Sequence, residues 1–291
     1  MSNQPLVYIL MILTAAAWGF QPNCVKWLDA EWSPVTITVT RYFLIGALLL
    51  SYVKFYEKRS LLPPRSCWLP LFGMGFTGVM VNNVGQFTGL QYTTVTNATL
   101  ISAMTPSMTA FLAFIFLRER LTRGMAAGIA LSFAGVVLIV SHGSWEIIRH
   151  IRFNFGDLLC LAAQFSWAVY TLLAAGVLKK MSPEWATGCA SICGTSVAAL
   201  YGFISGEISV VPLSAPAAAS FVYIVLIGGI FSMVSWNLAV KKVGAGVPPI
   251  FLNIMPVVGM VSGHFLFGDE IGTVQLLGAA AICSGVYLTT H

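Results

Sequence analysis

The stretch NATLISAMTPSMTAFLAFIFLRER, Asn97 to Arg120, decides how the rest of this chain is interpreted. It is a long apolar run with a single proline, Pro106, near its middle and charged residues at its end. The second half of the chain contains a matching run, FLNIMPVVGMVSGHFLFGDE, Phe251 to Glu270, with Pro256 in the corresponding place. The two prolines are 150 positions apart, which points to an internal repeat.

Other residue pairs share this spacing to within one position. They are Gly128 and Gly278, Gly135 and Gly285, and Trp18 and Trp167. Self-similarity at a fixed period is the signature of a duplicated structural unit. We therefore expect one unit to be present twice, with residues 1–141 as the first copy, 142–155 as a connecting loop and 156–291 as the second copy.

The composition excludes an ordinary soluble domain. Of 291 residues, 57% are hydrophobic and only 9% are charged, and the mean hydropathy is +0.84. Soluble domains carry about 25% charged residues, so this chain has too few to cover a wet surface. The sequence therefore predicts a polytopic protein of the lipid bilayer. The net charge of +5 follows from membrane topology, and we expect no nucleic-acid partner.

Nothing in the sequence has the spacing of a metal site or of a nucleophile with its base. The six cysteines are scattered through apolar runs, which is typical of small buried thiols. The motif GMGFTG, Gly73 to Gly78, matches a dinucleotide-binding pattern, but it lies in an apolar run and follows no strand. We therefore expect no cofactor, no metal and no catalytic residues.

A membrane-spanning helix needs about 20 apolar residues. Ten such runs can be placed, at residues 6–27, 34–55, 67–90, 95–117, 123–141, 156–178, 183–205, 217–240, 247–267 and 272–290. Each copy of the repeat then holds five spans, so the second copy is inserted upside down relative to the first. The predicted fold class is an all-α polytopic membrane protein of ten transmembrane helices in a 5+5 inverted-topology repeat.

The basic residues orient this bundle. With both termini in the cytoplasm, eleven lysines and arginines fall in inner loops and only three fall outside, while Arg41 lies inside a span. This distribution follows the positive-inside rule. Inverted repeats are a hallmark of secondary transporters, which bind their substrate near the midplane between the two halves.

Several short motifs resemble those of the drug/metabolite transporter (DMT) superfamily, and specifically of EamA-type transporters. They are the Trp18-Gly19 pair, Arg41, the proline-then-LRERLT ending from Pro106 to Thr122, and GDLLCLAAQFSWAVY from Gly156 to Tyr170. The resemblance covers nearly the whole chain and implies a bacterial inner-membrane carrier, often an exporter of amino acids or related metabolites. One departure is visible, because the second copy reads FGDEIGT where the first reads LRERLT.

Polar and aromatic residues inside the spans are candidates for substrate binding, because such groups face a cavity or another helix. They are Trp18, Asn82, Gln86, Gln164, Trp167, Trp236 and Asn253. A twofold axis would bring Trp18 and Trp167 to opposite walls of one chamber. The alternative for the amides is helix packing along a stripe of glycines, and for the tryptophans it is packing or the interfacial belt.

Pro106 and Pro256 each remove a backbone hydrogen bond in the middle of a span. We expect kinks that line the cavity and act as hinges, and the alternative is a tolerated structural kink. Two ionisable residues are further candidates. Arg41 could contact a substrate carboxylate, or only snorkel or pair with carbonyl groups. His264 could couple proton movement, or only form a structural hydrogen bond.

The predicted function is secondary transport of a small amphipathic solute by alternating access. An amino acid is the preferred solute, and export is the direction that the resemblance implies. One alternative is an importer of a quaternary amine, which tryptophan faces would hold, or of a nucleoside-like solute. Another is a membrane enzyme that processes lipids. The fifth and tenth helices are expected to pack outside the cavity or to support a homodimer.

Overall fold

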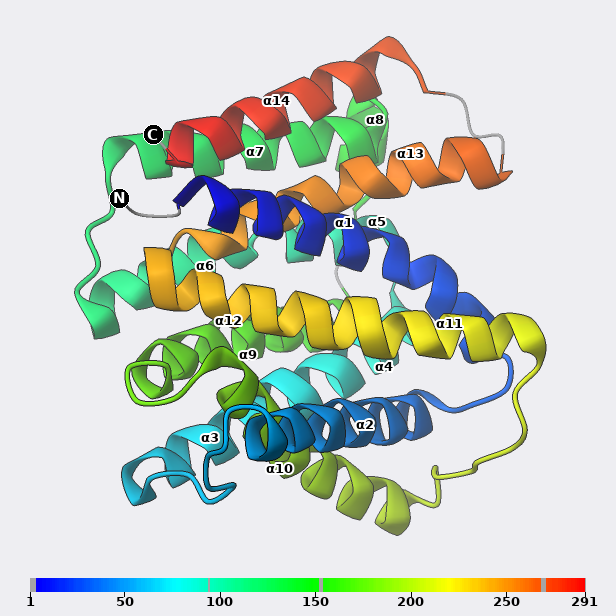
Figure 1. The fold of residues 1–291 in the computed structure, drawn as a ribbon. Coiled ribbons are helices and arrows are strands. Elements are labelled where there is room, and N and C mark those ends of the chain that lie inside the picture. The colour runs from blue at the N-terminus through cyan, green and yellow to red at the C-terminus, as the bar shows by residue number, and fades with distance from the viewer. Residues whose placement is uncertain (1–3, 94, 152–153, 268–270, 291) are drawn as a thin grey trace.

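A computed structural model of the chain describes residues 4–93, 95–151, 154–267 and 271–290. Within these residues the regular elements are all helices, which stack side by side as a bundle (Figure 1). The α-helices are α1 (Gln4–Leu28), α2 (Pro34–Phe55), α3 (Trp68–Met74), α4 (Gly85–Tyr92), α5 (Val95–Ser102), α6 (Thr105–Leu112), α7 (Arg123–Ser141), α8 (Trp145–Arg149), α9 (Phe155–Val177), α10 (Pro183–Ser205), α11 (Ala215–Val225), α12 (Ser232–Val243), α13 (Met255–Phe267) and α14 (Thr273–Thr290). The 3-10 and π-helical segments are η1 (Arg65–Cys67), η2 (Gly75–Val84), η3 (Ala113–Leu117), η4 (Leu226–Phe231) and η5 (Pro248–Ile254).

Many of these helices are apolar enough for a bilayer. In the described residues, seven helical segments are long and apolar enough to cross a membrane, and Pro248–Ser262 and Thr273–Thr289 are apolar but shorter. The predicted span 67–90 is helical as well, but glycines and amides make it less apolar. Helices suit this role because they satisfy their backbone hydrogen bonds internally. The protein is a multi-pass membrane protein, as the composition predicted.

Polar caps define where several helices begin. The hydroxyl of Ser33 accepts a hydrogen bond from the backbone N–H of Thr36 at 3.1 Å, and the proline that follows Ser33 pre-sets the first turn of α2. Thr122 caps α7 in the same way. Asn154 and Asp157 form a reciprocal capping box at the start of α9.

The repeat-related prolines begin helices instead of bending them. The predicted run 95–117 is divided into α5, α6 and η3, and Pro106 is the second residue of α6. The predicted run 247–267 is divided into η5 and α13, and Pro256 is the second residue of α13. Proline is tolerated in a first turn, where its missing N–H would have no helical partner in any case. In the first span a two-residue turn separates α5 from α6, and in the second the helix changes from 3-10 to α geometry just before Pro256.

The third and eighth predicted spans contain π-helical segments at equivalent places. The segment η2 lies between α3 and α4, and η4 lies between α11 and α12. A π-helix shifts the backbone hydrogen bonds along the chain, and such bulges are frequent at functional sites. The carbonyl of Gly228, in η4, accepts hydrogen bonds from side chains of α1 and α2.

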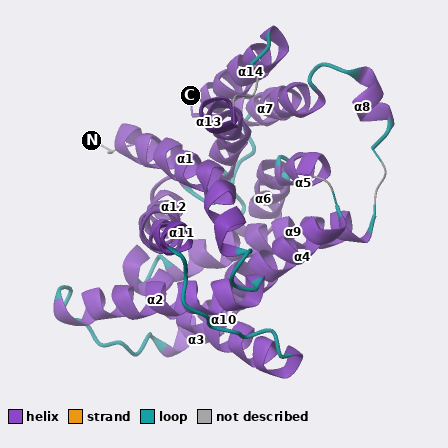
Figure 2. Ribbon diagram, turned by 90° about the vertical axis from the view of Figure 1, so that its right-hand side faces the viewer, coloured by secondary structure: helices purple, strands orange, loops and turns teal. Residues whose placement is uncertain are grey.

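The helices α7 and α14 lie side by side at one edge of the molecule (Figures 1 and 2). A Cβ atom on Gly135 would lie 2.6 Å from the carbonyl oxygen of Gly278, and one on Gly128 would lie 2.5 Å from that of Gly285. Only small residues allow two helix backbones to approach this closely. The contact moves backward along α14 as it moves forward along α7, so the two helices are antiparallel.

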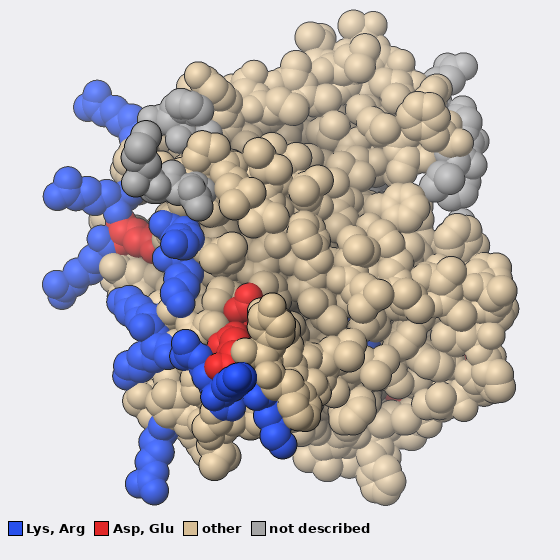
Figure 3. Space-filling model, viewed as in Figure 1, with Lys and Arg blue, Asp and Glu red and all other residues tan. Residues whose placement is uncertain are grey.

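Lysine and arginine side chains gather at one end of the bundle (Figure 3). They come from the end of α2 and its following loop, the loop before α7, the turn after α9 and the end of α12. Both chain ends lie at the same end of the bundle (Figure 1).

A carboxylate links two loops at this basic end. Glu119, in the loop before α7, accepts hydrogen bonds from the backbone N–H groups of Ala245 at 2.8 Å and Gly246 at 3.0 Å. These two residues lie just before Val247, the N-cap of η5, so Glu119 holds the loop that leads into that segment. Its predicted counterpart, Glu270, lies outside the described residues.

Candidate functional site

Three tryptophans from three helices meet in the core, and we call them the tryptophan cluster. The ring of Trp18 in α1 lies 5.5 Å from the rings of both Trp167 in α9 and Trp236 in α12, centre to centre. The rings of Trp167 and Trp236 are 5.3 Å apart. Trp18 meets Trp167 edge to face at 85°, a favoured aromatic geometry. The two repeat-related rings therefore touch each other instead of facing across an open chamber.

The indole N–H groups of the cluster differ in their partners. Trp18 donates to the carbonyl oxygen of Gly228 at 2.8 Å. Trp167 and Trp236 are 6% and 1% exposed, and their N–H groups make no hydrogen bond to any described residue. A buried donor without a partner costs about 1–3 kcal/mol. The cluster therefore contains two buried donors whose hydrogen bonds the described chain does not satisfy.

Asn253 and Thr14 are among several further buried polar side chains without partners in the described chain, and the others include three residues of α10. Asn253, in η5, is 1% exposed, and neither atom of its amide bonds to a described residue. Thr14, one turn before Trp18, is equally buried, and its hydroxyl has no partner within the described chain. The segments that carry them, η5 and α1, pack against each other. Unsatisfied groups of this kind are rare in native cores and call for an explanation such as ligand binding.

Two other candidate amides take part in helix packing. Asn82 donates to the carbonyl oxygen of Ala163 at 2.9 Å, which joins η2 to α9. Gln164 accepts a hydrogen bond from Thr105 at 2.9 Å and donates to Ser102 at 3.1 Å. Gln164 thereby ties α9 to both sides of the break between α5 and α6.

The remaining candidates lie in different surroundings. Arg41, in α2, is 3% exposed and donates at 3.2 Å to the same carbonyl of Gly228 that Trp18 contacts. His264 lies at an exposed position of α13, and Gln86 is half-buried in α4. Of the two ionisable candidates, Arg41 is the one that shares a partner with the tryptophan cluster.

Sequence reasoning missed two parts of this site. The ring of Tyr170 stacks on Trp167 at 4.8 Å, and its hydroxyl accepts a hydrogen bond from Asn237 at 2.9 Å. Its position one turn after Trp167 on the same helix is the signal that could have found it. The carbonyl of Gly228 has no such signal, because it is a backbone group within a π-helical segment.

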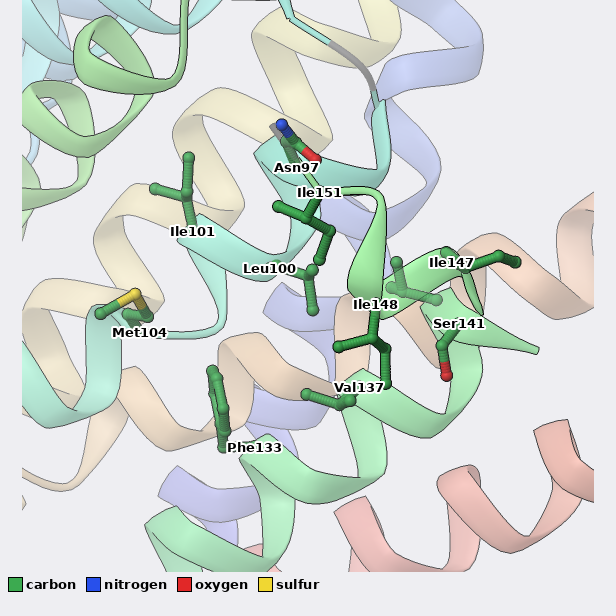
Figure 4. Close-up of a pocket in the computed structure, with 11 residues that line it drawn as sticks. Asn97, Leu100, Ile101, Met104, Phe133, Val137, Ser141, Ile147, Ile148 and Ile151 are labelled. Atoms are coloured by element: carbon green, nitrogen blue, oxygen red, sulfur yellow. The ribbon is translucent and has the colours of Figure 1, made fainter. Parts of the chain in front are cut away.

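A separate cavity of about 230 Å³ lies between α5, α7 and the segment that contains α8 (Figure 4). Its lining is apolar except for Asn97 and Ser141. The amide nitrogen of Asn97 already donates to Asp157 at 3.1 Å. This cavity offers little to a polar solute, so the tryptophan cluster is the better candidate site.

Comparison with known proteins identifies related carriers. The sequence model of the EamA-like transporter family matches residues 5–141 and again residues 154–291. The chain is 28% identical to the uncharacterized transporter YyaM of Bacillus subtilis, over 96% of this chain and 92% of that protein. It is 27% identical to a probable terminal-alkyne amino-acid exporter of Streptantibioticus cattleyicolor, over 96% and 94% of the two chains. It is 25% identical to an S-adenosylmethionine/S-adenosylhomocysteine transporter of Chlamydia muridarum, over 99% and 92%.

A solved crystal structure has the same fold. It covers 98% of this chain and 96% of its own, with a TM-score of 0.81 and 17% sequence identity. At this level of identity the likeness concerns the fold alone.

Proposed function

Since the chain belongs to the EamA-like transporter family, we propose that it is a secondary transporter working by alternating access across the bacterial inner membrane. The proposed solute is a small amphipathic metabolite, with an amino acid as first choice and export as direction. Family membership and the relatives make the protein a membrane transporter of small molecules. The solute, the direction and the binding residues are the proposal.

The tryptophan cluster is the observation that carries this proposal. Trp18 comes from the first proposed half and Trp167 and Trp236 come from the second, and transporters with inverted repeats bind between their halves. Aromatic walls with two unpartnered indole donors suit a solute with an apolar part and a polar part. Asn253 joins the proposed site because of its unpartnered amide, whereas Asn82 and Gln164 are assigned to packing.

The proposed architecture is the ten-helix inverted repeat, with units 1–141 and 156–291 joined by residues 142–155. Two matches to one family, one in each unit, support it. The antiparallel contact of α7 and α14 through repeat-related glycines also supports it, because equivalent helices of an inverted repeat run in opposite directions. The breaks before Pro106 and Pro256 are the proposed hinges.

The proposed orientation places both termini in the cytoplasm. Basic residues gather at the end of the bundle where the termini lie, and basic loops are retained on the cytoplasmic side (Figures 1 and 3). Export rests on the Streptantibioticus relative. The edge position of α7 and α14 in Figure 2 leaves their outer faces open to a second copy, so a homodimer through them is part of the proposal.

Counterflow in proteoliposomes tests the function. Vesicles that contain the purified protein and an unlabelled amino-acid mixture should accumulate at least one radiolabelled amino acid. Trp18→Ala and Trp236→Ala should lower that exchange by about tenfold, because each removes aromatic contacts of the cluster. Trp27→Ala is the matched control, since Trp27 is 49% exposed, and it should exchange like the wild type.

The outcomes separate the alternatives. Exchange of choline or of a nucleoside, without exchange of any amino acid, would replace the proposed solute by the alternative one. Absence of all exchange, together with conversion of a lipid added to the vesicles, would overturn transport in favour of a lipid-processing enzyme.

A further inference from the structure

Arg41 is a buried positive charge that has no negative partner among the described residues. It lies inside the span Pro34–Phe55 and is 3% exposed. In the part of the chain that the structure describes, the one ion pair joins Arg59 to Glu57 in the loop after α2. A guanidinium does not lose its proton in a protein, so Arg41 remains charged in this core.

The groups that surround Arg41 are neutral. Its Nη2 donates to Oε1 of Gln21 at 3.0 Å and to the carbonyl of Gly228 at 3.2 Å, and its Nε has no partner in the described chain. The guanidinium lies 5.1 Å from the centre of the Tyr42 ring. Dipoles and a ring face offset only part of the several kcal/mol that a desolvated charge costs. Snorkelling does not explain the position, because the side chain does not reach the surface.

One carbonyl oxygen joins Arg41 to the tryptophan cluster. The oxygen of Gly228 accepts from Nε1 of Trp18 at 2.8 Å and from Nη2 of Arg41 at 3.2 Å. A Cβ atom at this glycine would lie 2.6 Å from Oε1 of Gln21, so glycine is what allows the contact between Gln21 and Arg41. The guanidinium is therefore an immediate neighbour of the indole of Trp18.

Among the described residues, the core offers no unengaged carboxylate for a positive charge on the solute. Among the described residues the buried carboxylate is that of Asp157, which is 3% exposed. It accepts hydrogen bonds from Thr93, from Asn97 and from the backbone N–H of Asn154 at the start of α9. Asp157 is thus already engaged in holding a helix end.

We propose that Arg41 binds the carboxylate of the transported solute, with the apolar part of the solute against Trp18, Trp167 and Trp236. This inference rests on the proposed function and makes monocarboxylates the substrate class, with or without an ammonium group. A planar guanidinium matches a carboxylate through two parallel hydrogen bonds. A phosphate dianion would require further positive charge.

Matched compounds test the inference on the purified full-length chain. The first series is L-phenylalanine, 3-phenylpropanoate, L-phenylalaninamide and phenethylamine. The second series consists of the four corresponding compounds with the side chain of leucine. Thermal shift gives the affinity of each compound, and counterflow gives its transport. The wild type should prefer both acids over the amide and the amine by about tenfold to a hundredfold, the range of a charge-assisted hydrogen bond.

Substitution of Arg41 should remove that preference. Arg41→Gln should reduce the ratio of acid to amide affinity to about twofold or less, and Arg41→Lys should retain part of it. Arg59→Gln is the matched control, because Arg59 is an arginine with 54% of its side chain exposed, and it should keep the full preference. A ratio measured on one protein sample does not change merely because a variant is less stable.

Several results would overturn the inference. They are equal affinity of the wild type for acid and amide, an unchanged ratio in Arg41→Gln, and no binding of any compound in either series. If the wild type instead exchanges only cationic or uncharged solutes, the carboxylate assignment fails and the transport function stands. If it exchanges no solute at all, both fail.

Discussion

Asn253 and Asn83 are both buried asparagines, but only the amide of Asn83 has hydrogen-bond partners in the described chain. The amide nitrogen of Asn83 lies within hydrogen-bond distance of the Tyr42 hydroxyl at 3.2 Å and of two backbone carbonyls, at 3.1 Å and 3.0 Å. Neither amide atom of Asn253 bonds to a described residue. A satisfied buried amide stabilises a core, whereas an unsatisfied one destabilises it by about 1–3 kcal/mol. The unsatisfied amide of Asn253 is consistent with the proposal that it contacts the solute.

Leucine substitutions at these two positions should separate stability from function. Asn253→Leu removes an unsatisfied amide, so the unfolding temperature in detergent should be unchanged or higher, while solute exchange falls about tenfold. Asn83→Leu removes satisfied hydrogen bonds and should lower the free energy of unfolding by about 1–3 kcal/mol. Destabilised Asn253→Leu protein with normal exchange would show that this amide is structural and takes no part in binding.

The sequence predicted candidate amides, but it did not distinguish those that hydrogen-bond to other helices from the one that has no partner in the described chain. Asn82, Gln164 and Asn253 look alike in the sequence, as polar residues in apolar runs. The partners of the first two are distant in the chain: Asn82 contacts a carbonyl 81 positions later, and Gln164 contacts a hydroxyl 59 positions earlier. Such contacts depend on tertiary packing, which no local pattern encodes.

At the scale of elements, the contact between α7 and α14 depends on glycine. Gly135→Ala would place a Cβ atom 2.6 Å from the carbonyl oxygen of Gly278, so the helices must separate and stability should fall by about 1–3 kcal/mol. Gly176→Ala, in α9, is the matched control, because nothing lies within 4 Å of the added atom. It should raise stability by about 1 kcal/mol through helix propensity. Thermal unfolding in one detergent compares them, and equal stability would argue against the close contact.

Glu119 fastens the loop before α7 to the start of η5, and these elements belong to different proposed halves. Glu119→Gln keeps the size of the side chain but removes its charge, so stability should fall by about 1–2 kcal/mol. The same change should speed the labelling of a cysteine at half-buried Val247 by an impermeant maleimide, in a background without native cysteines. Glu146→Gln, at an exposed position, should change neither quantity. An unchanged labelling rate in Glu119→Gln would mean that this link does not hold the halves together.

The positions of the helices were predictable from the sequence. The points inside the predicted spans where the helix ends or changes type were predictable only in part. Apolar length is a local property, and the run 34–55 therefore agrees with α2 at both ends. Pro106 and Pro256 predicted kinks, because the missing N–H is a property of the residue, but in the structure both prolines lie in the first turn of a helical segment. The π-helical segments η2 and η4 were not predicted, because no residue type marks a shift in backbone hydrogen bonding.

At the scale of the whole molecule, the architecture depends on whether the two proposed halves cross the membrane in the same direction or in opposite directions. The spacing of Pro106 and Pro256 shows that the halves correspond, but a repeat of this kind can be parallel or inverted. Inversion was predicted from an odd number of expected spans in each half and from the placement of basic residues, and it stays a prediction. The antiparallel contact of α7 and α14 supports the same direction from independent, tertiary contacts.

Cysteine labelling tests this relation directly. Thr122 and Thr273 are exposed residues at the starts of α7 and α14, which occupy equivalent places in the two halves. An inverted repeat puts these starts on opposite sides of the membrane. In a background without the native cysteines, an impermeant maleimide should therefore label Thr122→Cys in inside-out vesicles and Thr273→Cys in right-side-out vesicles. Labelling of both from one side would mean that the halves are parallel, and the tryptophan cluster would then no longer lie at an interface between inverted halves.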